Sequence, residues 1–487
     1  MRSSLRARHV IGYADGDHRL ILDGEVVWEG DTILHVGGPF EGRVDERIDC
    51  GDAVVAPGFV DLNALADIDH AIFDSFQTPD LLLGQEWSSE YVGRRAELLT
   101  AEQLAFRREY ALVQLLLHGV TTALPIAAES YRAWAETEEE FEDVVAIAGR
   151  LGNRLYLGPS YRYGVPVVDA GGHRSIHWDA REGDAGLRAA EHFVERFDGA
   201  QSGRIRGLLA PARIETQTAE SLRATRRAAD RLGCPLRLHA GQSHEELADL
   251  RAAYGTRPVE VLDSLGVLGP RTIIPHAWAV DGHSEVGPPE AAHGSSDLRR
   301  LADSGTTVAF CPLAAGRYAM VMESFDRYRA AGVRLGLGTD TFPPDMLRAI
   351  DQGSILTKAV ERSQDAGQVA DLYRAATLGG AAALGREDLG RLAAGAKADL
   401  VVVGLGDLRT GPVEDPVRTM VLGAAPVVRV VVDGRTVVVD GRVPGVDEAS
   451  MRSRAQELFD VYRTSFSDRD SRRRSTAELM PPTFPSL

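Results

Sequence analysis

The sequence predicts an α/β fold, a (β/α)8 TIM barrel with a composite β-sandwich formed from both chain ends. Short apolar runs alternate with helix-like stretches through the middle of the 487-residue chain, as in parallel strands with crossover helices. The first 56 residues have β-branched and apolar clusters broken by Asp-Gly, Glu-Gly and Gly-Gly pairs, which indicates short strands and turns. Near the C-terminus, Asp-Gly pairs between Val-rich runs indicate hairpins. An open doubly wound sheet is the alternative, but no G-x-G-x-x-G turn follows an early strand.

The elements can be assigned in chain order. Candidate barrel strands lie in AVVAPGFVDL, TTALPI, RLYLGPSYR, IRGLLAPA, PLRLHA, RTIIPHA, TTVAFCP and RLGLGTD. Between them, TAEQLAFRREYALVQLLLHG and TQTAESLRATRRAADRLG have apolar residues at helical spacing. We expect residues 1–56 and 386–446 to form the sandwich, and residues 57–385 the barrel. Residues 447–487 should form a C-terminal helix followed by a frayed tail, or a tail that packs on a partner subunit.

Composition limits the class of partner. The chain has 54 Lys and Arg against 71 Asp and Glu, a formal net charge of −17. Such a surface repels phosphate backbones and anionic lipids, so we expect neither nucleic acid nor membrane as a partner. No signal-peptide pattern and no apolar stretch of about 18 residues occurs, which favours a cytoplasmic protein. The three Cys are too few and too scattered for a disulfide framework or a Cys-based zinc site.

Polar residues close several predicted barrel strands, where barrel enzymes place their chemistry. His239 ends PLRLH, His276 ends RTIIPH and Asp340 ends RLGLGTD. Two imidazoles and a carboxylate suit a borderline divalent ion such as Zn²⁺, and Fe²⁺, Mn²⁺ or Co²⁺ suit the same ligands. A single His at a strand end is usually structural, but three such residues on three strands favour one metal ion that activates water.

Several motifs are similar to those of the amidohydrolase superfamily, in particular its cytosine deaminase and triazine hydrolase branch. They are VVAPGFVDLNA, LLLHGVTTAL, LRLHAGQSHEE, IIPHAW, AGVRLGLGTD and LGRLAAGAKADLVVV. The resemblance covers nearly the whole chain and implies the same barrel and sandwich, often in a homodimer. It implies that His239 is a metal ligand and that Asp340 is a ligand or accepts a proton from the attacking water. His276 would complete the metal site or hydrogen-bond the nucleophile and substrate.

The chain departs from this family at the first barrel strand. Asn63 replaces the first His of the family's His-x-His, as in phenylurea and molinate hydrolases, and Leu65 replaces the second. An amide oxygen is a poorer Zn²⁺ ligand than imidazole, so Asn63 is a weak fourth ligand, a group behind the ligands or a substrate contact. Asp67, Asp69 and His70 could bend back into the site, although helix capping and solvent exposure are the simpler expectation.

A second departure concerns proton transfer. Gln242 stands where deaminases of this branch carry a Glu that protonates the ring nitrogen and the departing ammonia. Gln can orient a substrate but cannot protonate it, so Gln242 disfavours simple transfer of the deaminase mechanism. His244, Glu245 and Glu246 are nearby candidates for the missing donor.

The lysines decide the number of metals. The chain has two, Lys358 and Lys397, and neither lies on the fourth predicted strand, where binuclear members of the superfamily carry a bridging Lys. This excludes a Lys-bridged binuclear centre and leaves one divalent metal ion, or none.

Substrate-contacting residues are harder to read. Tyr161 and Arg162 at the third strand and Trp278 after His276 lie where a flat or anionic substrate would bind. Structural packing is an equal alternative for each of them. The Gly- and Pro-rich stretch DGHSEVGPPEAAHGSSD, with His283 and His293, resembles a loop over the barrel mouth.

We expect a metal-dependent hydrolase that cleaves a C–N bond of amide, urea or carbamate type in a small non-peptide molecule. Asp340, His276 and Gln242 are the candidate catalytic residues. An aminohydrolase of a nitrogen heterocycle is the first alternative. The second is a metal-free protein of this fold with a binding role or another form of catalysis, which the missing His-x-His favours.

Overall fold

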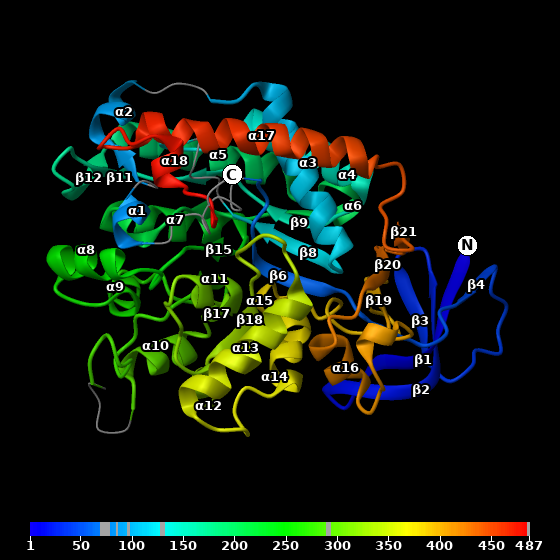
Figure 1. Ribbon diagram of the computed structural model, residues 1–487. Helices are drawn as coiled ribbons and strands as arrows, with labels where there is room; N and C mark the ends of the chain where they lie inside the picture. Colours follow the sequence, from blue (N-terminus) through cyan, green and yellow to red (C-terminus); the bar gives the residue numbers. More distant parts are fainter. Residues whose placement is uncertain (69–77, 84–85, 95–97, 127–131, 289–293, 485–487) are drawn as a thin grey trace.

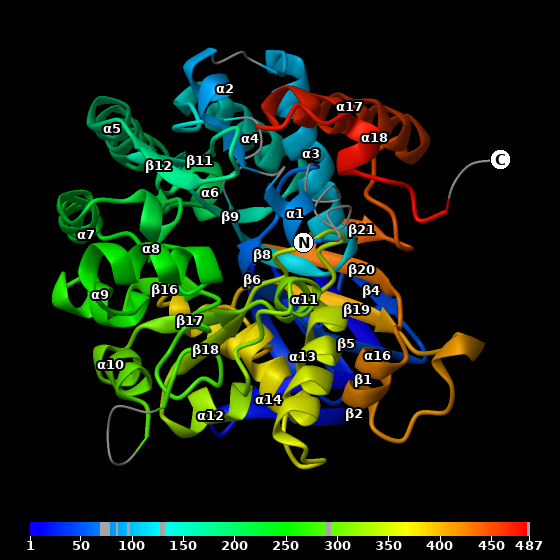
Figure 2. The same ribbon diagram turned by 60° about the vertical axis from the view of Figure 1, so that its left-hand side comes forward.

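Strands from both ends of the chain pair in one mixed sheet. The computed structural model describes residues 1–68, 78–83, 86–94, 98–126, 132–288 and 294–484 (Figure 1). Within them the sheet has the order β21-β20-β19-β5-β1-β2-β3, with β4 paired to β1. Its strands are β1 (Arg2–Ala14), β2 (Asp17–Glu29), β3 (Thr32–Gly37), β4 (Glu46–Asp49), β5 (Ala53–Pro57), β19 (Leu400–Gly404), β20 (Val427–Val432) and β21 (Arg435–Val439). The blue and orange strands lie together in Figures 1 and 2 because Val54 of β5 pairs with Val403 of β19.

Two hairpins of this sheet turn at Asp-Gly pairs, as predicted between the Val-rich runs near the C-terminus, whereas the predicted break at Asp23-Gly24 lies inside β2. Asp433 and Gly434 connect β20 to β21 with φ of +52° and +76°, and Asp15 and Gly16 connect β1 to β2 with φ of +53° and +81°. Asp-Gly pairs accept two consecutive positive φ values, which match the twist of the flanking strands.

Two parallel sheets form the middle of the chain. One has the order β13-β9-β8-β6 and the other β15-β16-β17-β18. Their strands are β6 (Phe59–Ala64), β8 (Val120–Pro125), β9 (Arg154–Leu157), β13 (Ile205–Gly207), β15 (Leu236–Arg237), β16 (Thr272–Pro275), β17 (Thr307–Phe310) and β18 (Arg334–Leu337). A parallel bridge joins Leu209 to Leu236 at one side. At the other, the Asp340 N–H donates to the Asn63 carbonyl at 3.0 Å, so the two sheets meet along both edges.

Helices lie around these parallel strands in both views (Figures 1 and 2). They include α3 (Ala101–Leu117), α4 (Glu138–Leu151), α5 (Ala180–Phe197), α7 (Ala219–Leu232), α8 (His244–Tyr254), α9 (Pro258–Ser264), α10 (Ser296–Ser304), α12 (Phe325–Ala330), α13 (Met346–Glu361) and α14 (Val369–Arg374). Thr100 and Gln103 form a capping box at the start of α3. Left-handed glycines end α4 and α7 at Gly152 and Gly233.

A buried ion pair joins the parallel strands to the mixed sheet. The Arg154 guanidinium on β9 donates to both oxygens of Asp399, at 2.9 and 3.1 Å, and to Asp433 at 2.9 Å. The three side chains are 1%, 3% and 8% exposed. This contact fixes the mixed sheet against β9.

The C-terminal segment packs against its own chain as far as Met480, so the expectation of a frayed tail is wrong up to that residue. Helices α17 (Glu448–Arg469) and α18 (Thr476–Leu479) follow one another, and α17 lies across α3 in Figure 1. Arg469 lies over the Trp87 ring, 5.6 Å from its centroid, and Arg474 contacts Asp80 at 3.1 Å. Among the described residues no helix has the length and apolar character that crossing a bilayer requires.

Candidate metal centre

Three side chains predicted from separate strands converge in the structure. His239, His276 and Asp340 each offer one ligand atom, and these atoms lie within 4.8 Å of one another. Nε2 of His276 lies 3.4 Å from Oδ2 of Asp340, whose side chain is 8% exposed, and the two imidazole centroids are 5.5 Å apart. The parallel strands β15, β16 and β18 bring them together because their carboxyl ends meet at one end of the sheet.

The backbone at these positions is strained. His276, Ala277 and Asp340 have φ of +67°, +49° and +45°, a region that costs a residue with a Cβ about 1–3 kcal/mol. Nδ1 of His239 faces the Ala212 carbonyl at 3.3 Å. A proton on Nδ1 would serve this hydrogen bond and leave Nε2 as the ligand atom.

The electrostatics of His239, His276 and Asp340, the trio of candidate ligands, fit a bound cation. Burial lowers the pKa of His239 well below its usual value, and burial with the nearby Arg213 lowers the pKa of His276 to about 3. Both imidazoles are therefore neutral at pH 7, the form that binds metal. Burial and the neighbouring Asp61 raise the pKa of Asp340, so a cation beside it would offset an unfavourable buried charge. Nε2 of His276 and Oδ1 of Asn63 are buried without a hydrogen-bond partner among the described residues.

Asn63 lies beside the trio on β6. Its Nδ2 donates to the Cys311 Sγ at 3.7 Å, its backbone N–H donates to Asp61 at 3.0 Å, and its carbonyl accepts from Asp340. Asp61 also accepts from the Thr339 hydroxyl and N–H, at 2.5 and 3.1 Å. Asp61 therefore connects β6 to the segment that carries Asp340. Sequence reasoning missed this residue, and the only signal for it is its place as the Asp of GFVDL.

The other first-strand candidates do not join the trio. Asp67 is buried, pairs with Arg107 and accepts from the Tyr462 hydroxyl at 3.4 Å, so it neither faces solvent nor reaches the site. Asp69, His70 and, further along the chain, His293 lie outside the described residues. Both lysines are engaged elsewhere, Lys358 with the carbonyl of Gln364 and Lys397 with Asp31.

Gln242 lies three residues after His239, and its side-chain oxygen makes no hydrogen bond within the described structure. Its Oε1 is buried, while its N–H and that of Gly241 donate to the Glu246 carboxylate at 2.9 and 2.5 Å. Burial and the neighbouring Glu215 raise the pKa of Glu246 to about 8. His244 is exposed and pairs with Glu285 at 3.0 Å. Of the nearby donor candidates, Glu246 is the one held behind Gln242.

Two of the three predicted substrate contacts have structural partners instead. Tyr161 is fully buried, and its hydroxyl bonds the Thr225 hydroxyl at 2.7 Å beneath α7. Arg162 is 4% exposed and donates to the carbonyls of Ala133 and Arg132, both at 2.6 Å. These contacts correct the prediction because they direct both side chains into packing rather than toward a substrate.

Trp278 lies two residues after His276 and is buried. Its ring lies between those of His244 and His283, at 4.9 and 5.0 Å, and its Nε1 is buried without a partner among the described residues.

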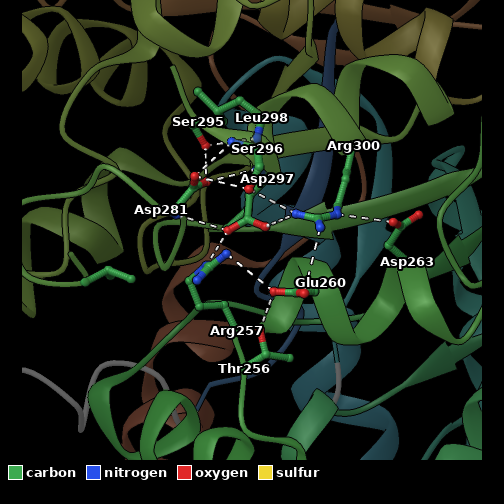
Figure 3. A network of polar contacts seen from close by, with 12 residues as sticks. Thr256, Arg257, Glu260, Asp263, Asp281, Ser295, Ser296, Asp297, Leu298 and Arg300 are labelled. Atoms are coloured by element: carbon green, nitrogen blue, oxygen red, sulfur yellow. Dashed lines mark hydrogen bonds and ion pairs between the residues drawn. The ribbon is translucent and has the colours of Figure 1, made fainter. Parts of the chain in front are cut away.

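The loop after β16 is anchored by a buried polar network (Figure 3). The Asp281 carboxylate accepts from Ser295, Ser296 and Asp297 at the start of α10. The Asp297 carboxylate in turn accepts from Arg257 at 2.7 Å and pairs with an arginine of α10. The described part of the predicted mouth loop is therefore held firmly to α9 and α10.

Known proteins resemble this chain along most of its length. Residues 54–437 match the model of the amidohydrolase family. The 5-methylthioadenosine/S-adenosylhomocysteine deaminase of Pelotomaculum thermopropionicum is 27% identical over 453 residues, which cover 91% of this chain and 95% of that protein.

Two solved structures share the fold. The zinc-bound adenosine deaminase of Xanthomonas campestris has a TM-score of 0.76 and 23% identity, covering 95% of this chain and 98% of that one. The zinc complex of atrazine chlorohydrolase from Arthrobacter aurescens TC1 has a TM-score of 0.75 and 19% identity, covering 94% of this chain and 100% of that one.

Proposed function

Because the chain belongs to the amidohydrolase family, we propose that it is a metal-dependent hydrolase that cleaves a C–N bond in a small non-peptide substrate. The observation that carries this function is the convergence of His239, His276 and Asp340, with ligand atoms within 4.8 Å of one another. The bond is of amide, urea or carbamate type, because Gln242 replaces the acid that protonates the ring nitrogen in deaminases, and the leaving amine of these substrates can instead receive the proton that Asp340 takes from water.

The trio would hold one divalent ion, with Oδ1 of Asn63 as the fourth ligand in place of the family's first His. Zinc is favoured because the Xanthomonas deaminase and the Arthrobacter chlorohydrolase bind it, and Fe²⁺, Mn²⁺ and Co²⁺ suit the same donors. When bound, the ion supplies Lewis acidity toward water and toward the scissile group.

The side chains divide the remaining work. The Asp340 carboxylate accepts the proton of the attacking water, 3.4 Å from the Nε2 through which His276 would bind the ion. The unpartnered Oε1 of Gln242 accepts from a substrate N–H, and the Trp278 N–H donates to a substrate acceptor. Glu246, whose pKa is raised by burial and by Glu215, is the buried acid beside Gln242 that could supply a further proton.

Deamination of a nitrogen heterocycle is the second candidate function. Similarity to the Pelotomaculum and Xanthomonas deaminases supports it, whereas Gln242 opposes it. A metal-free binding protein is the third, and the absence of the first-strand histidines supports it.

We also infer the architecture that would house this site. The two parallel sheets together would form the (β/α)8 barrel of residues 57–385, and the mixed sheet would form the sandwich of residues 1–56 and 386–446, with 447–487 as a C-terminal segment. A homodimer and a cytoplasmic location stay predictions.

Metal analysis tests the function directly. Plasma mass spectrometry of the purified protein should find about one divalent ion per chain, lost in His239→Ala and kept in the exposed-histidine control His173→Ala. Ammonia release would then be assayed with ureas, amides and carbamates beside aminoheterocycles. No metal in the wild type after incubation with Zn²⁺, Mn²⁺ and Co²⁺ would contradict the hydrolytic function and direct attention to ligand binding.

A further inference from the structure

Two consecutive residues at the candidate metal centre have left-handed backbones. His276 has φ of +67° and Ala277 of +49°, and neither is a glycine. Such conformations persist only where surrounding contacts hold them. Residues just beyond β15 and at the end of β16 make some of these contacts, because the Ala277 N–H donates to the carbonyls of Ala240 and Pro275, both at 3.0 Å.

The opposite side is held from α12. The Tyr328 hydroxyl donates to the Ala277 carbonyl at 2.7 Å, and the tyrosine is fully buried. Its neighbour Arg327 donates to the carbonyls of Asp281 and Gly282, at 2.9 and 3.0 Å. One short helix therefore fixes the Ala277–Trp278 peptide, one residue after His276, and the loop that follows it.

Loss of the tyrosine oxygen would affect the imidazole through the backbone. The Ala277 carbonyl would lose a buried donor, and a buried acceptor without a partner is unfavourable. The chain could then relax toward an ordinary φ by turning the peptides on either side of Ala277. That rotation would move the His276 side chain from its place 3.4 Å from Asp340.

We propose that Tyr328 is a positioning residue whose hydroxyl, by fixing the Ala277 carbonyl, holds the His276 imidazole toward His239 and Asp340. Groups behind a metal ligand that orient it typically affect metal affinity or activity by about 10- to 100-fold. This role rests on the proposed function, because the position of His276 matters for catalysis only if the trio holds a metal.

Three tyrosine-to-phenylalanine variants isolate the effect, since each removes one oxygen. Tyr328→Phe removes the donor to Ala277. Tyr163→Phe removes a hydrogen bond of the same length, 2.7 Å to Asp184, away from the trio. Tyr373→Phe removes a buried hydroxyl that has no partner in the described part of the chain.

Zn²⁺ affinity, measured by competition with a chromophoric chelator, is the first readout. Tyr328→Phe should bind Zn²⁺ about 10- to 100-fold more weakly, whereas the two controls should change by no more than about twofold. The double variant Tyr328→Phe/Ala277→Gly should recover part of the affinity, because glycine adopts positive φ without strain. It also serves as the test protein if Tyr328→Phe alone does not fold.

The NMR resonance of ¹³Cε1-labelled His276, identified by its loss in His276→Gln, is the second readout. It should move in Tyr328→Phe and stay in both controls. Unchanged affinity together with an unmoved resonance would overturn the positioning role, as would an equal loss of affinity in Tyr163→Phe. If the wild type binds no Zn²⁺, the proposed function fails separately, and the resonance alone decides whether Tyr328 positions His276.

Discussion

Arg154→Met should destabilise the protein strongly, because it breaks the ion pair that joins β9 to the mixed sheet. The guanidinium makes contacts of 2.9, 3.1 and 2.9 Å with Asp399 and Asp433. Methionine keeps much of the apolar stem and removes the charge. Two carboxylates would then remain in an interior where their side chains are 3% and 8% exposed.

The structure sets the size of the effect. Removing one partner of a buried ion pair costs about 3–5 kcal/mol, since the remaining charge is desolvated without compensation. Arg204 and Lys397 lie 3.6 and 3.7 Å from Asp433 and would compensate in part, so we expect about 3 kcal/mol.

Urea unfolding followed by tryptophan fluorescence and circular dichroism measures this change. Arg150→Met is the matched control, because the Arg150–Glu109 pair is 2.8 Å long but its side chains are 54% and 27% exposed. An exposed pair contributes about 0–1 kcal/mol. If both variants lower the free energy of unfolding equally, the burial of the Arg154 ion pair does not make it more stabilising than an exposed pair, and the reasoning is refuted.

Three further outcomes are expected. Burial lowers the pKa of His18 to about 4, below the unfolded value of about 6.5. The free energy of unfolding should therefore fall by about 3 kcal/mol between pH 6.5 and pH 4, and urea melts of His18→Gln should lack this pH dependence. Gly158→Ala would place a Cβ 1.8 Å from the Leu208 carbonyl and should abolish soluble expression, whereas Gly38→Ala, with open space around it, should express normally. Because the raised pKa of Asp340 makes protons compete with the metal, Zn²⁺ affinity should increase with pH; calorimetry in two buffers that shows no proton release would contradict this.

The site could be predicted from sequence where the chemistry follows strand geometry. His239, His276 and Asp340 each close a short apolar run, and parallel strands bring their carboxyl ends to one place. The Asp-Gly pairs at the β1–β2 and β20–β21 turns likewise determine the turn conformation by themselves, since few other residue pairs accept two consecutive positive φ values.

Sequence patterns did not indicate partners that are distant along the chain. Adjacent residues of a strand point to opposite faces, and a run ending in Tyr161 and Arg162 does not say which face meets the site. Asp67 pairs with Arg107 on a helix 40 positions later, and Tyr328 reaches a carbonyl 51 positions earlier. Neither contact leaves a periodic or compositional trace.

The mixed sheet also governs the order in which the chain can fold during synthesis. β5 is complete early, but its partner β19 emerges from the ribosome only after about 350 further residues, roughly 20–70 s at typical elongation rates. Throughout that interval β5 presents an unpaired edge, which other chains can extend. Fragments that stop before residue 400 should therefore aggregate, and chaperone supply during translation should limit the yield of native protein.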